Sequence, residues 1–419
     1  MTISPQRRRL GLYVAFYPNA NITAAVLIEF LRALRRHVRG LLILIWDRLL
    51  THRARSTQAF FNQCPQLHIV LLPPYRARHV WLKASINGCE PENFLFDTGA
   101  SVTVMDSSWA AEHGLKTQGH MQASAAGDCI ELKDVKVAVL DVNPGFEPLF
   151  WRRMAGVIGY DVISRFVVTV DNDDSTLVLH DPASWHNPGT EKPLPMVMNG
   201  TVPAIRGTFD GSDEGLFRLD VGSSSTVDVH APFANAKGLK GRMGRTQSVD
   251  GVGFGGAFSS DIGRLRSMSL GPYEWDDPIV VVSNATDGAF ASEEFAGNIG
   301  NRILERLRVT FDYQRREVLL EPGKRYSDRD RLTRCGVLLT RREGVVTVAS
   351  VLANSPADHA GLREGDQVLA LEGRDIGQWD LPDVSALLDD GAVGRKVPIR
   401  VRHSDVEKSL RIKLAEVVR

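Results

Sequence analysis

The 419-residue chain has little of several features that would reveal its class at once. Its cysteines are too few and too scattered for a disulfide scaffold, and no CxxC pair suggests zinc. They are Cys64, Cys89, Cys129 and Cys335. The longest strongly apolar run, residues 40–46, is far shorter than the roughly 20 residues needed to cross a bilayer. The N-terminus has basic residues but no clean apolar core and no small-residue cleavage site, so we expect a cytoplasmic protein without a signal peptide.

The chain also has no net charge, because its 50 basic and 50 acidic residues cancel. The two kinds of residue are, however, unevenly distributed along it. Residues 1–78 hold twelve arginines, no lysine and two acidic residues, a balance of +10, so the other 341 residues carry −10. A break of this size suggests two pieces with different histories or partners. The ordinary proportions of hydrophobic and charged residues, 43% and 24%, exclude global disorder, and the length predicts two to four domains.

The pattern of apolar residues predicts a mainly β chain. Residues 1–78 are expected to form a short α/β segment with strands at 11–17, 41–46 and 67–72 and a helix capped by Thr23 that ends near residue 38. From residue 80 to about 321 the sequence has short strands separated by turn residues. A stretch rich in proline, glycine and asparagine, residues 186–200, divides this region in two. The final segment, from about residue 331, mixes strands with two short helices.

An internal repeat links the two parts of the β region. Residues 86–97, INGCEPENFLFD, match residues 209–220, FDGSDEGLFRLD, at an offset of 123 without a gap. A second block, AGVIGYDVISRFVVTVD at 155–171, matches AGNIGNRILERLRVTFD at 296–312 at an offset of 141. The simplest account is two copies of one β-domain, the second with a longer middle.

Each copy contains an aspartate at the end of an apolar strand, followed two residues later by glycine. This pattern predicts a tight turn in which backbone N–H groups hydrogen-bond the carboxylate. Two copies around a pseudo-twofold axis would bring Asp97 and Asp220 together, where they would share a proton. One could then act as a general base on water and the other as a general acid towards a peptide carbonyl. The alternative is that both are turn aspartates, and Val221 in place of a hydroxyl residue favours it for Asp220.

FLFDTGASVTVMD together with AGVIGYDVISRF resembles the retropepsin-like aspartic proteases, and the paired arrangement is similar to their bacterial two-lobed, single-chain relatives. The resemblance implies two closed pepsin/retropepsin-like β-barrel lobes, a first lobe at 79–190 and a second lobe at 191–325. It also implies a cleft between them, a flap at 119–131 or 247–262, and endopeptidase activity without metal or cofactor. Asp97 and Asp220 would be the catalytic pair. The loop residues implied are Thr98, which would tie the two loops together, Gly99, Gly222 and Ser223.

Residues 350–373, SVLANSPADHAGLREGDQVLALEG, predict a short helix capped by Ser355 and ended by Gly361, then a strand at 367–371. The string resembles PDZ domains appended to bacterial proteases, over residues 332–417. The resemblance implies that a peptide C-terminus is added as a strand to a sheet edge, beside a second helix at 381–388. The peptide-binding residues would be Cys335, Gly336, Val337 and Leu338. The alternative is a PDZ fold that only packs on the protease body.

The basic N-terminal segment, LLILIWDRLLTHRARSTQAFF followed by LHIVLLPPY, resembles a fragment of mariner-like DDE transposases. Of the three metal-binding carboxylates of that family only Asp47 has a match, so we expect neither a metal site nor nucleic-acid binding; a native α/β extension is the alternative. The leading hypothesis is an aspartic endopeptidase whose PDZ domain recognises proteins or peptides. The alternatives are a catalytically degenerate peptide-binding protein, DNA transposition, and a protease whose first lobe forms a homodimer.

Overall fold

The computed structural model of the chain divides into two compact units, which are described separately. The smaller unit comprises Met1–Pro73, Lys83–Pro91 and Gln122–Lys133, and the larger comprises Pro74–Leu82, Glu92–Met121 and Asp134–Arg419. The structure describes residues 2–4, 9–11, 42–46, 67–71, 75–76, 78–86, 89–90, 92–115, 121–125, 132–135, 137–174, 176–187, 189–253 and 256–418.

The described residues of the smaller unit form three strand pairs. β1 (Thr2–Ser4) is antiparallel to β2 (Arg9–Gly11), and β3 (Leu42–Trp46) is parallel to β4 (Leu67–Leu71). The strands expected at 41–46 and 67–72 are thus present over the residues of each that the structure describes. Residues 84–86 of β6 (His79–Ile86) pair with β9 (Met121–Ala125). The helix expected at 23–38, the strand at 11–17 beyond its first residue, and Asp47 lie outside the described residues, so the transposase resemblance stays a prediction.

The first lobe is organised around four short strands. They are β7 (Glu92–Phe96), β8 (Thr103–Asp106), β11 (Val137–Leu140) and β12 (Gly156–Ile158). β12 is parallel to β7 and antiparallel to β8, and β11 is parallel to β8. Phe94, Leu95 and Phe96 are all buried, because a strand covered on both faces has no polar side. The remaining elements are β5 (Tyr75–Arg76), β10 (Leu132–Val135), α3 (Ser107–Glu112), α4 (Asn143–Phe150) and α5 (Tyr160–Ile163).

The second lobe has the same arrangement of four strands. They are β18 (Asp213–Leu219), β19 (Val227–Val229), β24 (Ile279–Ser283) and β25 (Gly297–Ile299). β25 is parallel to β18 and antiparallel to β19, and β24 is parallel to β19. The other elements are β16 (Val197–Asn199), β17 (Val202–Phe209), β20 (Gln247–Gly253), β21 (Gly256–Arg264), β22 (Ser267–Leu270), β23 (Tyr273–Asp276), α6 (Ala231–Ala236), η2 (Leu239–Arg242), η3 (Ala289–Ala291) and α7 (Asn301–Leu304).

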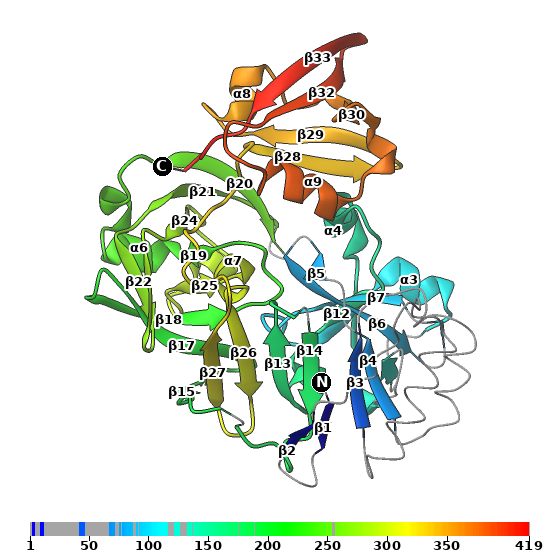
Figure 1. Cartoon of the computed structure of the whole chain (residues 1–419), viewed down its shortest axis with the longest axis vertical. Coiled ribbons are helices and arrows are strands. Elements are labelled where there is room, and N and C mark those ends of the chain that lie inside the picture. The colour runs from blue at the N-terminus through cyan, green and yellow to red at the C-terminus, as the bar shows by residue number, and fades with distance from the viewer. Residues whose placement is uncertain are drawn as a thin grey trace, which may run out of the picture. The chain divides into compact units, whose positions relative to one another are not determined.

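A five-stranded sheet joins the two lobes, which the sequence did not lead us to expect (Figure 1). Its order is β14 (Thr176–His180), β13 (Val167–Asp171), β26 (Leu307–Asp312), β27 (Glu317–Pro322) and β15 (Leu194–Pro195). β13 and β26 are antiparallel, and Thr169 pairs with Thr310, its own counterpart at the offset of 141. Their hydroxyls are hydrogen-bonded at 2.9 Å.

The C-terminal region forms a separate sheet with its own core. The sheet order is β28 (Val337–Arg342), β29 (Val345–Val351), β30 (Gln367–Leu371), β32 (Lys396–His403) and β33 (Val406–Lys413), with β31 (Arg374–Asp375) paired to β30. Its helices are α8 (Pro356–Ala360), η4 (Ile376–Gln378) and α9 (Leu381–Leu388). Ser355 caps α8 by accepting a hydrogen bond from the Asp358 N–H, and Gly361 ends the helix in the left-handed conformation. The predicted helices and strand are confirmed here.

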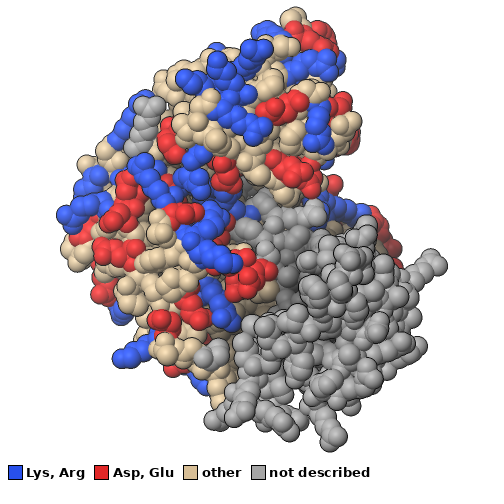
Figure 2. Space-filling view, viewed as in Figure 1, with Lys and Arg blue, Asp and Glu red and all other residues tan. Residues whose placement is uncertain are grey.

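The fold is mainly β, as the sequence predicted. Among the described residues, no helix combines the length and apolar character that a membrane crossing requires. On the face shown in Figure 2, basic and acidic side chains of the described residues are interspersed. The acidic balance of residues 79–419 therefore does not gather into one continuous patch on this face.

Candidate active site

The two predicted aspartates occupy matching turns. Asp97 directly follows β7 and Asp220 directly follows β18, and their N–H groups donate to the carbonyls of Ile158 and Ile299, respectively. In the first turn, the Gly99 N–H donates to Asp97 Oδ1 at 2.7 Å. In the second, the Gly222 N–H donates to Asp220 Oδ1 at 2.9 Å. The predicted geometry, a strand-end carboxylate held by the amide of a loop glycine, is present in both lobes.

The two turns lie against each other. A Cβ atom built on Gly222 would be 2.2 Å from Asp97 Cγ, and one built on Gly99 would be 2.9 Å from Asp220 Cγ. Each loop glycine therefore faces the aspartate of the other lobe, and any side chain at either position would collide with a carboxyl group. This reciprocal approach explains glycine at both positions and brings Asp97 and Asp220 together within one chain.

Thr98 connects the two turns through its hydroxyl. Thr98 Oγ1 donates to the Leu219 carbonyl at 2.6 Å and accepts from the Val221 N–H at 3.0 Å, and the Thr98 side chain is buried. Val221 has no hydroxyl with which to return these bonds, so the connection is one-sided. Ser223 does not substitute for it: its hydroxyl accepts a hydrogen bond from the Ser225 N–H within its own loop.

Asn301 is a second support of the Asp220 turn that sequence reasoning missed. Its Nδ2 donates to the carbonyls of Val221 and Arg78, both at 2.7 Å, and its backbone N–H donates to the Ser223 carbonyl. At the matching position the first lobe has Tyr160. The two blocks differ at nine of their 17 positions, so the sequence did not single out this change from tyrosine to asparagine.

Burial raises the pKa of both carboxyl groups. Burial raises the pKa of Asp97 well above its usual value, and the neighbouring charge of Asp220 raises it further. Burial also raises the pKa of Asp220, but the positive charge of Arg218 opposes that rise. Two coupled carboxyl groups in such a site hold one proton between them over a wide pH range, which suits them for simultaneous acid and base catalysis.

Of the two predicted flap segments, the structure describes part of each. β20 and β21 form an antiparallel hairpin whose register runs from Gln247 opposite Ile262 to Gly253 opposite Gly256. Gln247 Nε2 donates to the Ala353 carbonyl at 3.3 Å, so the base of this hairpin contacts the C-terminal domain. In the other candidate, 119–131, only the strand β9 is described.

The predicted peptide-binding residues of the C-terminal domain have different environments. The N–H groups of Cys335 and Gly336 donate to Thr333 Oγ1 at 3.2 and 3.1 Å, and Cys335 is buried. Gly336 has φ of +79°, and a Cβ atom there would lie 2.3 Å from the Ser355 Cβ. Val337 begins β28, and the Leu338 side chain is 41% exposed. Of the four, Leu338 is the side chain most accessible to a ligand.

The first lobe packs on the edge strand of this domain. Helix α4 contacts β28, and Trp151, the residue after α4, packs against the core of the C-terminal domain. The guanidinium of Arg341, on β28, lies 4.2 Å from the centre of the Trp151 ring. A small cavity at this contact is lined by Trp81, Phe150, Trp151, Arg152, Arg341, Asp380, Leu381 and Pro382. Lobe residues therefore lie between β28 and the start of α9, where the resemblance places a bound peptide.

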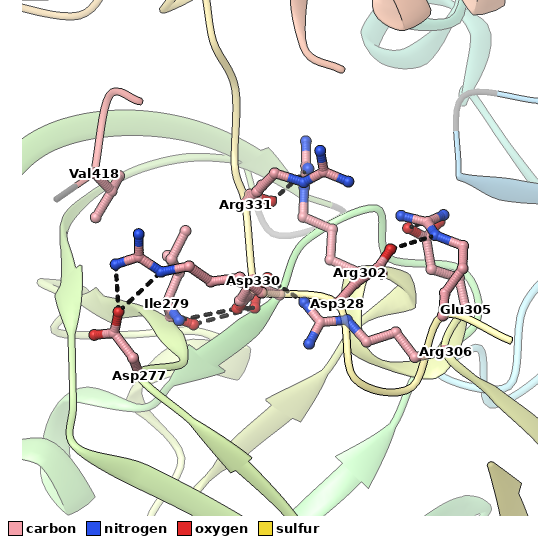
Figure 3. Close-up of polar contacts among 12 residues, drawn as sticks. Asp277, Ile279, Arg302, Glu305, Arg306, Asp328, Asp330, Arg331 and Val418 are labelled. Atoms are coloured by element: carbon pink, nitrogen blue, oxygen red, sulfur yellow. Dashed lines mark hydrogen bonds and ion pairs between the residues drawn. The ribbon is translucent and has the colours of Figure 1, made fainter. Parts of the chain in front are cut away.

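A buried ionic network attaches the segment between the second lobe and the C-terminal domain (Figure 3). Asp330 is 1% exposed, and its Oδ1 pairs with Arg306 Nη2 at 2.9 Å. Its Oδ2 accepts from the Thr226 hydroxyl at 2.7 Å and from the Ile279 N–H at 2.9 Å. Arg302, next to Asn301 in α7, donates to the Arg331 carbonyl at 2.7 Å. One short helix thus contacts both the Asp220 turn and the connecting segment.

Two protein-family models match parts of the chain. Residues 82–162 match the aspartyl protease family model, and residues 347–403 match the PDZ domain model. No curated protein matches the chain. The chain therefore carries an aspartyl protease domain, which includes the Asp97 turn, and a PDZ domain, a module that binds peptides or proteins.

Proposed function

We propose that residues 79–325 form an aspartic endopeptidase whose two lobes supply one catalytic aspartate each, Asp97 and Asp220. The observation that carries this proposal is the reciprocal contact of the two turns, in which Gly99 lies against Asp220 and Gly222 against Asp97. Two aspartates with only structural roles in separate turns would not be expected to face each other in a buried site, because their charges repel. A pair that shares a proton requires this arrangement.

The strand pairing supports a duplicated lobe. Phe94 pairs with Gly156 in the first lobe, and their counterparts Phe217 and Gly297 pair in the second. The pairing of Thr169 with its own counterpart Thr310 is what an approximate twofold axis through the central sheet requires. The same axis would relate Asp97 to Asp220.

In the proposed reaction, a water molecule lies between the two carboxyl groups. The ionised carboxylate takes a proton from this water as the oxygen attacks the peptide carbonyl carbon, and the protonated carboxyl donates its proton to the carbonyl oxygen. The resulting tetrahedral diol breaks down when the C–N bond cleaves and the leaving nitrogen receives the proton held by the first carboxylate. As the C=O bond re-forms, a hydroxyl of the diol returns its proton to the second carboxylate. The products are a free carboxyl terminus and a free amine, and the pair again holds a single shared proton.

The alternative function is a catalytically degenerate peptide-binding protein. It is motivated by Val221, which lacks the hydroxyl that Thr98 supplies in the first lobe. The contacts of Val221 favour catalysis instead. Its N–H is held by Thr98 and its carbonyl by Asn301, so the turn is anchored on both sides without a hydroxyl of its own. We further propose that the PDZ domain binds protein or peptide segments and positions them as substrates.

Digestion of a peptide library between pH 3 and 8 tests the proposal. Asp97→Asn and Asp220→Asn should each abolish the cleavage seen with wild type, while Asp287→Asn, an exposed carboxylate of the second lobe, should leave it unchanged. A mixture of the two inactive variants should remain inactive, because both aspartates belong to one chain. Cleavage restored by mixing would show that Asp97 of one chain pairs with Asp220 of another. Cleavage by Asp220→Asn alone at the wild-type rate would contradict the two-lobe pair and support the homodimer of first lobes.

A further inference from the structure

Three residues that pair across neighbouring strands next to each aspartate turn are apolar in the first lobe and polar or charged in the second. In the first lobe, Val157 on β12 pairs with Leu95 on β7 and Val104 on β8, and all three belong to an apolar cluster. The corresponding residues of the second lobe are polar or charged: Asn298 on β25 pairs with Arg218 on β18 and Asp228 on β19. The same strand positions therefore form an apolar row in one lobe and a charged row in the other.

The environment of Arg218 holds its guanidinium in place. Its Nε donates to Asn298 Oδ1, and its Cζ lies 5.4 Å from the centre of the Phe295 ring. Its Nη2 lies 3.3 Å from His230 Nε2. A guanidinium can only donate, so this imidazole nitrogen must accept, and His230 must be neutral. Burial first, and then the charge of Arg218, lower the pKa of His230 to about 4, in agreement with that assignment.

Asp228 is the carboxyl group of this row, but at acidic pH it does not supply a negative charge to balance Arg218. Asp228 Oδ1 accepts a hydrogen bond from the Ser225 hydroxyl at 2.6 Å. Burial raises the pKa of Asp228 to about 7. Below that pH Asp228 is largely protonated, so it does not compensate the positive charge of Arg218 over the mildly acidic range. His230 carries no negative charge in either of its forms and cannot do so.

Arg218, on β18, precedes Asp220, which directly follows that strand, by two residues, and side chains two apart along extended backbone point to the same face. Phe217 and Leu219, between and beside them, point into the core and are fully buried. Asp97 has Leu95 at the equivalent position and receives no such charge from its own strand. The two aspartates are otherwise alike, each at a strand end and each bonded to a loop glycine.

We propose that Arg218 is a positioning residue that makes the pair unequal, so that Asp220 is its ionised member and Asp97 carries the shared proton. This inference rests on the proposed peptidase function. Asp220 would then take the proton from water, and Asp97 would donate its proton to the substrate carbonyl oxygen. The charge of Arg218 thereby determines which aspartate is the general base and which is the general acid, a choice that a symmetric pair would leave open.

The test is the pH dependence of kcat/KM for wild type and Arg218→Leu, which places the first-lobe residue at this position. An opposite charge nearby lowers a carboxyl pKa by about 1–3 units. We expect the acidic limb of the profile to move to higher pH by about one unit in Arg218→Leu. At a pH below that limb, this shift corresponds to a roughly tenfold loss of kcat/KM. Arg218→Lys should restore most of the wild-type profile, because it retains the charge.

Asp228→Asn is the matched control, because asparagine copies the uncharged form that Asp228 has below its pKa of about 7; it should not move an acidic limb that lies below that pH. A triple variant, Arg218→Leu, Asp228→Val and Asn298→Val, copies the whole apolar row and replaces Arg218→Leu if the single variant fails to fold. An unmoved acidic limb in either folded variant overturns the role of Arg218, provided wild type still requires both aspartates. If wild-type cleavage does not depend on Asp97 and Asp220, the proposed function itself fails, and the two results are distinguishable.

Discussion

Replacing Thr98 by valine tests how the two active-site turns are joined. The Thr98 hydroxyl satisfies two buried groups of the other lobe, the Leu219 carbonyl and the Val221 N–H. Valine has nearly the same shape but no hydroxyl, so both groups lose these partners while packing is preserved. An unsatisfied buried polar group costs about 1–3 kcal/mol, so we expect the free energy of unfolding to fall by about 2–6 kcal/mol.

Urea unfolding followed by tryptophan fluorescence measures this loss, and kcat/KM on a cleaved peptide measures its effect on alignment. Thr98→Ser is the matched control, because it keeps the hydroxyl and removes only a methyl group; we expect it to lose about 1 kcal/mol. A further expectation is a loss of kcat/KM of at least about tenfold in Thr98→Val, since small displacements of reacting groups are costly. The reasoning is refuted if Thr98→Val is as stable as wild type, or if Thr98→Ser is destabilised equally.

Three other predictions concern stability and access to the PDZ domain. Asp330→Asn should lower the free energy of unfolding by about 3–5 kcal/mol because it breaks a buried ion pair; the control Asp328→Asn, whose pair with Arg325 is 42% exposed on both sides, should cost under about 1 kcal/mol in the same urea titration. Trp151→Ala should tighten binding of C-terminal peptides to the PDZ domain at least about threefold in fluorescence anisotropy, because Trp151 lies against β28; unchanged affinity would show that the lobe does not obstruct this edge. The pKa of Asp97 is raised in the folded state, so its contribution to stability is present at low pH and is lost as pH rises through that pKa. Asp97→Asn, which does not titrate, should therefore be more stable relative to wild type in urea at pH 7 than at pH 4, and an equal difference at the two pH values would contradict the shift.

Features that depend on neighbours in the sequence could be predicted. The Asp97 and Asp220 turns follow from a buried strand that ends in Asp-x-Gly, and the Ser355 cap with Gly361 fixes both ends of α8. Helix α9 has the bounds expected, Leu381–Leu388, because an N-cap aspartate and a proline mark its start. In each case, the residues that determine the structure lie within a few positions of it.

Features that depend on partners far along the chain could not be predicted. The central sheet joins β13 and β26, which are separated by 141 residues at their midpoints, and no local pattern gives that register. The same holds for Asn301, whose amide is directed at Val221, and for Arg218, whose neighbours come from β25 and β19. Both residues differ from their counterparts Tyr160 and Leu95, but so do many other positions of the two repeated blocks, and only the cross-strand contacts show what each of them touches.

The contact of α4 and Trp151 with β28 changes the interpretation of the PDZ domain. Sequence alone left open whether this domain binds peptides or only packs on the protease body. The described contacts show that it packs on the body through the strand edge that peptide binding would use. A peptide that bound there by strand addition would have to displace the α4 segment, so binding and docking would compete.

The most direct test of the central claim is kcat/KM of Asp220→Asn on a peptide that wild type cleaves, with Asp287→Asn as control. General acid–base catalysis contributes about 10²- to 10⁴-fold, so the account predicts a loss of at least about 100-fold at the wild-type optimum with the folded state intact. A loss of this size in Asp97→Asn but not in Asp220→Asn would contradict a catalytic pair formed by the two lobes of one chain.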